Sequence, residues 1–133
     1  MARHVIALVE DDTHIMRLFN DLLGEEGYST LAIPDGASAH AIIAREQPDL
    51  IILDLWLVRQ DAGWTIYNRL RTNDTTAHIP IIICSADIAQ LRERAPEIEA
   101  RSDGAVEKPF DIAILLALIA DLLRRAPAAR QAV

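Results

Sequence analysis

Hydrophobic residues are arranged along the chain in two alternating patterns. Short continuous apolar runs are typical of strands buried on both faces of a parallel sheet, and longer segments with apolar residues every three or four positions are typical of helices. The apolar runs cover residues 5–9, 50–53, 81–84 and 104–106, with a more polar run at 28–32. Helical patterns follow them at about residues 13–24, 37–46, 63–72, 87–100 and 112–125. The first of these predicts one apolar, core-facing side made of Ile15, Leu18, Phe19, Leu22 and Leu23.

Strand and helix alternate five times, which predicts a single α/β domain with a parallel five-stranded sheet and helices on both faces. The polar run at 28–32 fits an edge strand. Pro96, inside the fourth helical pattern, should break or kink that helix. Beyond residue 125 the chain is rich in alanine without an apolar stripe, so we expect a domain over 1–125 and a flexible tail or linker start over 126–133.

Composition narrows the class of protein. The 133 residues are enough for one domain with a full core, and 13 Lys plus Arg against 20 Asp plus Glu leave a net charge of -7. Such an acidic surface repels phosphate backbones, so we expect no direct binding of nucleic acid. The longest apolar run, residues 112–120, is shorter than the ~20 residues of a membrane helix. With no signal-peptide pattern at the start, we expect a cytoplasmic protein that does not enter the membrane.

The single cysteine and the histidines offer no metal or redox motif. Cys84 is alone, which excludes an internal disulfide framework, and its apolar surroundings indicate a small buried hydrophobic residue. The four histidines are scattered without ligand spacing.

Polar side chains follow the central apolar runs at the points where these runs end. They are Glu10, Asp11 and Asp12 after the run at 5–9, Asp54 after the run at 50–53, Ser85 after the run at 81–84, and Glu107 and Lys108 after the run at 104–106. Because ligands of open α/β sheets bind at the carboxyl ends of the strands, we expect these groups to converge at one edge. Converging carboxylates require a proton or a cation among them, and oxygen ligands favour Mg²⁺, or another divalent cation such as Mn²⁺. Lys108, the only lysine of the chain, adds a compact charge suited to a phosphoryl group or to Asp54.

Several of these residues also have ordinary structural interpretations. Asp12 is better explained as the N-cap of the first helix than as a ligand. Ser85 fits a helix cap and a site residue equally well. Lys108 fits a surface side chain lying over the core, although the following Pro109 favours a special geometry. Asp54 is flanked by apolar residues and needs a partner, which favours a functional role.

Four segments together resemble the receiver domain of two-component response regulators. They are Val9-Glu-Asp-Asp12, Pro48-Asp-Leu-Ile-Ile-Leu-Asp54, Ile81-Ile-Ile-Cys-Ser-Ala86 and Glu107-Lys-Pro-Phe110. The resemblance extends from about residue 5 to residue 123. It implies a flavodoxin-like (βα)₅ fold with strand order 2-1-3-4-5 and a stand-alone, CheY-like response regulator.

The resemblance also implies a role for each matching residue. Asp54 matches the aspartate that accepts a phosphoryl group from a histidine kinase or a phosphotransfer protein. Asp11 matches a direct ligand of Mg²⁺, Glu10 matches a ligand that acts through water, and Asp54 itself also belongs to the metal site. The backbone carbonyl of Trp56 matches a further ligand of the metal.

Two more residues match the part of the family's site that responds to phosphorylation. The resemblance implies that the hydroxyl of Ser85 bonds the phosphoryl group and that Lys108 pairs with it. A conformational change then carries the signal to a protein partner. On this reading the chain is a phosphoacceptor with slow self-dephosphorylation and is not an enzyme in the usual sense.

The chain departs from the family's usual pattern near the site. Ala105 stands where receivers usually have an aromatic residue, Val58 stands where they usually have proline, and the loop over 61–63 is one residue longer. We therefore expect an altered loop beside Asp54 and a weaker or different output through the fourth helix and fifth strand.

Two alternatives to a phosphorylated receiver differ in class. One is a flavodoxin-like cofactor or nucleotide binder, but the Glu-Asp-Asp-Thr loop after the first strand repels phosphate unless a metal intervenes. The other is a receiver-like interaction module whose output does not depend on phosphorylation.

The last helix carries more apolar surface than one core-facing stripe needs. The expected stripe is Ile112, Leu115, Leu116, Ile119, Leu122 and Leu123. Ile114 and Leu118 widen it, which fits either a broadly buried helix or a face for a homodimer or another partner. A homodimer would use the fourth helix, the fifth strand and the fifth helix. The kinase, the stimulus, the downstream protein and the completeness of the chain stay open.

Overall fold

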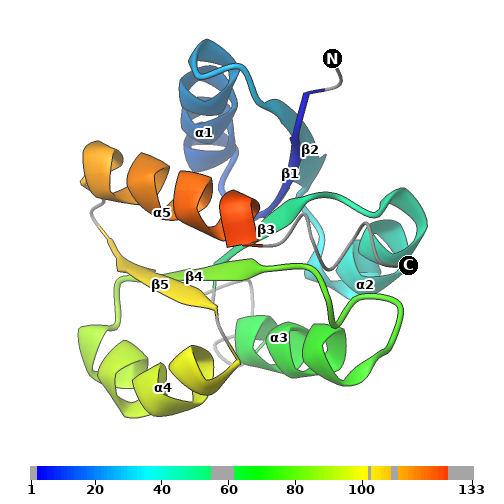
Figure 1. Ribbon diagram of the computed structural model, residues 1–133, viewed down its shortest axis with the longest axis vertical. Helices are drawn as coiled ribbons and strands as arrows, with labels where there is room; N and C mark the ends of the chain where they lie inside the picture. The colour runs from blue at the N-terminus through cyan, green and yellow to red at the C-terminus, as the bar shows by residue number, and fades with distance from the viewer. Residues whose placement is uncertain (1–2, 55–61, 102, 109–110, 126–133) are drawn as a thin grey trace.

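Five strands alternate with five helices within the parts of the chain that the structure describes (Figure 1). The structure is a computed structural model, and it describes residues 3–54, 62–101, 103–108 and 111–125. The elements are β1 (Val5–Val9), α1 (Thr13–Glu25), β2 (Ser29–Ile33), α2 (Gly36–Glu46), β3 (Leu50–Asp54), α3 (Ala62–Thr72), β4 (Ile81–Ser85), α4 (Ile88–Ala100), β5 (Gly104–Glu107) and α5 (Ile112–Arg125).

All the strands run parallel, in the order β2-β1-β3-β4-β5. This order and the alternation of elements confirm the flavodoxin-like fold predicted from the sequence. The polar strand β2 lies at one edge, as predicted, and β5 lies at the other, with Ala105 and Glu107 exposed. The central strands β3 and β4 are buried along their whole length, which explains their uninterrupted apolar sequences.

The sheet separates two hydrophobic cores. Helices α2, α3 and α4 cover one face, and α1 and α5 cover the other (Figure 1). Helix α5 buries Leu115, Ile119, Leu122 and Leu123 against the second core. This layering fixes the carboxyl ends of β1, β3 and β4 at one edge of the molecule.

Two positions predicted to face the core are instead exposed. Leu18 of α1 and Ile112 of α5 have 50% and 45% of their surface accessible, because both border an open groove between these helices. Ile114 is 62% exposed, whereas Leu118 packs on the core beside Gly104. The wide apolar surface of α5 is thus partly core and partly exposed.

The helix ends follow local side-chain chemistry. The carboxylate of Asp12 accepts hydrogen bonds from the N–H groups of His14 and Ile15 at the start of α1, which confirms the predicted cap. Helix α4 continues through Pro96, so a break in the helix is wrong, whereas the alternative of a kink stays a prediction. Pro96 is exposed, and the carbonyl that loses its helical partner belongs to the exposed Arg92, where water can satisfy it.

Across the described ranges, no helix has the length and apolar character needed to span a membrane.

Candidate functional site

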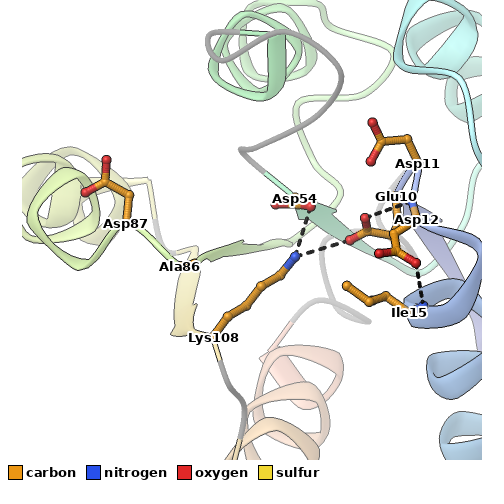
Figure 2. Close-up of a pocket in the computed structure, with 8 residues that line it drawn as sticks. All are labelled: Glu10, Asp11, Asp12, Ile15, Asp54, Ala86, Asp87 and Lys108. Carbon is orange, nitrogen blue, oxygen red and sulfur yellow. Dashed lines mark hydrogen bonds and ion pairs between the residues drawn. The ribbon is translucent and has the colours of Figure 1, made fainter.

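A pocket of about 480 Å³ opens at the carboxyl edge of the sheet (Figure 2). Its lining consists of Glu10, Asp11, Asp12, Ile15, Asp54, Ala86, Asp87 and Lys108. The strand register explains why they meet. Val9 pairs with Leu53, so the next residues, Glu10 and Asp54, leave neighbouring strands side by side. The sequence therefore places a carboxylate pair at this edge through strand pairing alone.

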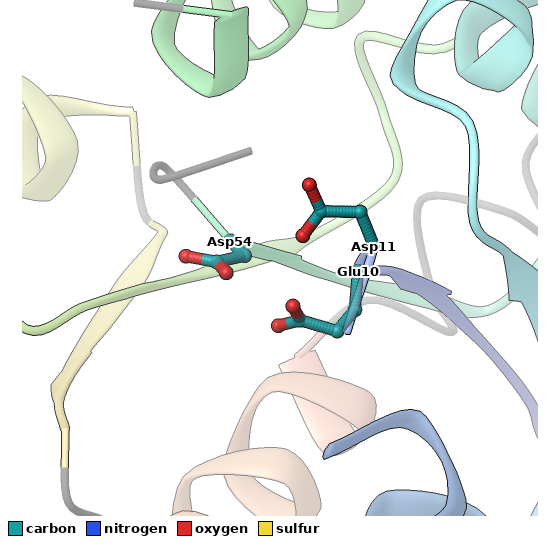
Figure 3. Close-up of side chains that lie close together, drawn as sticks. All are labelled: Glu10, Asp11 and Asp54. Atoms are coloured by element: carbon teal, nitrogen blue, oxygen red, sulfur yellow. The ribbon is translucent and has the colours of Figure 1, made fainter. Parts of the chain in front are cut away.

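Three carboxylates of the pocket lie close together. Glu10, Asp11 and Asp54 each offer one oxygen, and these atoms lie within 4.8 Å of one another (Figure 3). Glu10 and Asp54 are only 5% and 4% exposed, while Asp11 is half-buried. A cluster that offers only carboxylate oxygens fits Mg²⁺ or Mn²⁺ and does not fit metals that prefer sulfur or imidazole.

Among the described residues that line the pocket, Lys108 is the one with a positive charge. Its Nζ lies 2.9 Å from Oδ2 of Asp54 and 3.4 Å from Oε2 of Glu10 (Figure 2). Burial lowers the pKa of Lys108, but the hydrogen bond and charge of Asp54, with the charge of Glu10, outweigh burial and raise this pKa above its usual value. The ammonium therefore stays charged and points at the carboxylates, unlike a side chain that merely covers the core.

The environment of Glu10 disfavours its ionised form. Burial, followed by the hydrogen bond and charge of Asp54, raises the pKa of Glu10 from 4.5 to about 7, although the N–H of Asp12 and the charge of Lys108 act against this. Lys108 alone thus leaves the carboxylates incompletely compensated at neutral pH. A divalent cation would supply the missing positive charge.

Ser85 supports the start of α4 from behind the pocket. It is fully buried at the end of β4 and is not among the lining residues, although the next two residues, Ala86 and Asp87, are. Its Oγ accepts a hydrogen bond of 3.0 Å from the N–H of Asp87, whose side chain caps α4 by accepting from the N–H of Gln90. The hydroxyl therefore connects the site to α4.

Some expectations about the site concern residues outside the described ranges. Trp56, Val58 and Asp61 lie outside the described residues, as does the expected tail over 126–133. In contrast, Ile15, Ala86 and Asp87 line the pocket although the sequence reasoning had not assigned them there. The sequence could have predicted that Ala86 and Asp87 line the pocket, because they directly follow the end of a strand.

A second cavity adjoins the pocket. It measures about 450 Å³ and lies between α1 and α5, lined by Ile15, Leu18, Phe19, Leu22, Ala86, Lys108, Ile112 and Leu115. Ile15, Ala86 and Lys108 line both cavities, so this groove borders the acidic pocket. Apart from Lys108, its lining is apolar.

Fold and site together define a doubly wound α/β signalling domain with an acidic, lysine-bridged pocket at the carboxyl ends of its strands. Residues 6–120 match the family described as the response regulator receiver domain, and the chain belongs to this family. In the family, receivers act as phosphoacceptors of two-component systems, generally without being enzymes, and they bind Mg²⁺ at an acidic pocket. They interact with histidine kinases or phosphotransfer proteins and with downstream effectors.

The known relatives are longer proteins, and this chain is similar to only one part of each. The chain is 36% identical over 120 residues to the DNA-binding dual master transcriptional regulator RpaA of Synechocystis, covering 90% of this chain and 49% of RpaA. It is 31% identical over 125 residues to the phosphate regulon transcriptional regulatory protein PhoB of Pseudomonas aeruginosa, covering 94% of this chain and 54% of PhoB. The chain thus spans about half the length of these curated relatives.

Solved structures show the same architecture. The signal receiver domain of a protein described as a Luxo repressor from Vibrio parahaemolyticus superposes with a TM-score of 0.84 at 27% identity, covering 98% of both chains. A sensor protein from Polaromonas superposes with a TM-score of 0.75 at 30% identity, covering 94% of this chain and 96% of the other.

Proposed function

We propose that this protein is a response regulator that accepts a phosphoryl group on Asp54 in a Mg²⁺-dependent reaction. The donor is the phosphohistidine of a histidine kinase or phosphotransfer protein, and the output is a conformational change read by a protein partner. One observation carries the proposal: the buried carboxylate of Asp54 lies within 4.8 Å of an acidic pair suited to a metal and 2.9 Å from the ammonium of Lys108. This arrangement is suited to phosphoryl transfer, which depends mainly on positioning and charge stabilisation.

The proposed reaction assigns each side chain a separate task. An oxygen of Asp54 attacks phosphorus, a P–O bond forms as the P–N bond breaks, and the leaving imidazole nitrogen takes up a proton. Lys108 stabilises the charge on the phosphoryl oxygens from where it already contacts Asp54. Asp11 and Glu10 would hold the Mg²⁺, with the backbone carbonyl of Trp56 as a further proposed ligand. When bound, Mg²⁺ neutralises charge on the transferring group.

Ser85 is proposed to couple the phosphoryl group to α4. A hydroxyl can donate one hydrogen bond while it accepts others. The Oγ atom of Ser85 accepts a hydrogen bond from the N–H of Asp87, and the same hydroxyl can donate its proton to a phosphoryl oxygen. Because Ser85 lies behind the pocket, we expect this new bond to draw it forward and to shift the start of α4.

The groove between α1 and α5 supports docking of a phosphodonor protein. A protein donor must cover the mouth of the pocket to bring its phosphohistidine to Asp54. The groove borders this mouth and exposes Leu18 and Ile112, which provide apolar contact area. We therefore assign the kinase or phosphotransfer protein to this face.

The output side of the proposal concerns α4, β5 and α5. Exposed Ile88 and Ile114 lie on these helices and Ala105 lies between them in sequence on β5, which supports a face for a homodimer or a downstream protein. Size-exclusion chromatography with and without a phosphoryl mimic would test the homodimer. We further propose a stand-alone cytoplasmic regulator that does not itself bind nucleic acid or membranes, with a domain boundary near residue 125.

The decisive experiment is intact-mass measurement after incubation with Mg²⁺ and a small acyl-phosphate donor. We expect one phosphoryl adduct on the native protein and none on Asp54→Asn. The matched control is Asp12→Asn, which changes another carboxylate of the same pocket but keeps a side chain that caps helices well. It should retain the adduct. Absence of an Asp54-dependent adduct on the native protein would refute phosphorylation and leave the phosphorylation-independent interaction module.

A further inference from the structure

Arg94 of α4 and Arg101, the C-cap residue that follows α4, stack on two aromatic rings of α3. The Cζ atom of Arg94 lies 4.2 Å from the centre of the Trp64 ring, and that of Arg101 lies 5.3 Å from the centre of the Tyr67 ring. The two rings are themselves 5.0 Å apart. Helices α3 and α4 lie side by side on the same face of the sheet (Figure 1). Cationic stacking therefore joins the two helices.

Glu97 lies between the two arginines on α4 and orients them. Its carboxylate is 3.9 Å from Arg94 and 3.4 Å from Arg101. Arg101 also donates a hydrogen bond of 3.3 Å to Oδ1 of Asn68 on α3. Residues three, four and seven apart share one helix face, so this row faces α3 as a unit.

Helix α4 packs beside β5 and is held by a small number of buried side chains. It buries Leu91 and Ile98, whereas α5 buries four side chains, and Pro96 removes one hydrogen bond from its middle. Elements with few buried apolar contacts open at lower free energy than the rest of a domain. The stack on Trp64 therefore adds to the attachment that these buried side chains provide.

The two ends of α4 are held in different ways. At its carboxyl end, the N–H of Asp103 donates to the carbonyl of Ile98, and the buried Asp103 carboxylate accepts from Tyr67, Arg71 and the N–H of Ile81. This network lies at the edge of the sheet opposite the pocket, since Ile81 begins β4. At its amino end, α4 is tied to Ser85 beside the pocket. One end is thus anchored by buried charge, and the other follows the site.

We propose that the Arg94–Trp64 stack is a latch that holds the first half of α4 against α3 in the unphosphorylated protein and opens when Asp54 is phosphorylated. The inference rests on the proposed function and names how the same site is regulated. A contact made in only one of two states shifts their equilibrium by its own energy. A cation–π contact at a partly exposed site shifts it about two- to fivefold, which a phosphoryl group can reverse. The Arg101–Tyr67 stack adjoins the anchored end and stays closed.

The test compares Arg94→Gln with Arg94→Lys, which keeps the cation, and with Arg92→Gln, a matched change at an exposed arginine of the same helix. Hydrogen exchange of the full chain should be about two- to fivefold faster over residues 88–95 in Arg94→Gln and unchanged over 98–101. At limiting acyl phosphate with Mg²⁺, the phosphorylated fraction of this variant should rise by a similar factor, because opening α4 beforehand favours the phosphorylated state. Arg94→Lys should keep most of the native behaviour in both measurements, and Arg92→Gln should show neither effect.

Two results would overturn the latch. Unchanged exchange over residues 88–95 in Arg94→Gln would show that the stack does not hold α4. Faster exchange with an unchanged phosphorylated fraction would show a structural contact without any role in switching. If the native protein takes up no phosphoryl group on Asp54, the proposed function fails first and the latch fails with it. The native intact-mass measurement identifies that case before any Arg94 variant is compared.

Discussion

Replacing Glu10 with glutamine should stabilise the metal-free protein at neutral and alkaline pH. The native carboxyl is buried beside Asp54, and its pKa is raised from 4.5 to about 7. A group whose pKa is higher in the folded state contributes stability that is present below its unfolded pKa and is lost as the pH rises through the folded value. Native stability should therefore fall between about pH 4.5 and pH 7, and the neutral amide of Glu10→Gln should avoid this loss.

The size of the effect follows from the same pKa values. Each pH unit between 4.5 and about 7 corresponds to about 1.4 kcal/mol, so the native protein loses about 3 kcal/mol relative to the variant by pH 8. At pH 5 the Glu10 carboxyl is protonated in the fold and resembles the amide, so the difference should be small. Saturating Mg²⁺ should stabilise the native protein and weaken or reverse the advantage of Glu10→Gln, because the variant lacks one carboxylate of the metal cluster.

Urea unfolding from pH 5 to pH 8 measures this difference, first with a chelator and then with Mg²⁺. The matched control is Glu107→Gln, which changes an exposed carboxylate at the same edge of the sheet and leaves the buried pair of Glu10 and Asp54 intact. A difference between native protein and Glu10→Gln that stays constant with pH would refute the reasoning. So would a native protein that gains stability over this range without metal.

Three further outcomes follow from contacts elsewhere in the fold. Asp103→Ala should lower the free energy of unfolding by about 3–5 kcal/mol in urea titrations, because it leaves the buried guanidinium of Arg71 without its partner. Tyr67→Phe should cost about 1 kcal/mol at pH 7. Burial and the Asp103 bond raise the pKa of Tyr67 from 10 to about 12, so the stability it contributes below pH 10 is lost toward pH 12, and alkaline titration should show the native advantage shrinking. Leu18→Ser should slow phosphotransfer from a phosphohistidine protein severalfold, while labelling by a small acyl phosphate, followed by mass, stays unchanged.

The fold and the centre of the site could be predicted because both follow from local rules. Continuous apolar runs indicated buried parallel strands, and the carboxyl ends of such strands share one edge. This reasoning alone predicts that Glu10, Asp11, Asp54 and Lys108 lie together, and the structure places them around one pocket. The helix bounds were also close, and α5 spans the expected residues 112–125.

The remaining features depend on contacts between distant segments. Helix periodicity identified Leu18 and Ile112 as members of an apolar face, but it could not show that the space between α1 and α5 stays open there. Pro96 appeared disruptive because its position relative to solvent was unknown. The stack of Arg94 on Trp64 joins side chains thirty residues apart in sequence, a relation that no strand-end rule contains.

The exposed position of Ala105 bears on how a signal could leave the site. An aromatic residue at this place would lie on the outer strand of the sheet, yet β5 exposes Ala105 and pairs only with β4. Helix α4 packs beside β5, and it is also attached to Ser85 at one end and to Trp64 of α3 along its side. A shift of Ser85 would therefore reach α4 through the backbone of Asp87 and be opposed by the Trp64 stack, with no side chain needed at position 105. Under the proposed function, the signal would then take a route that does not pass through position 105.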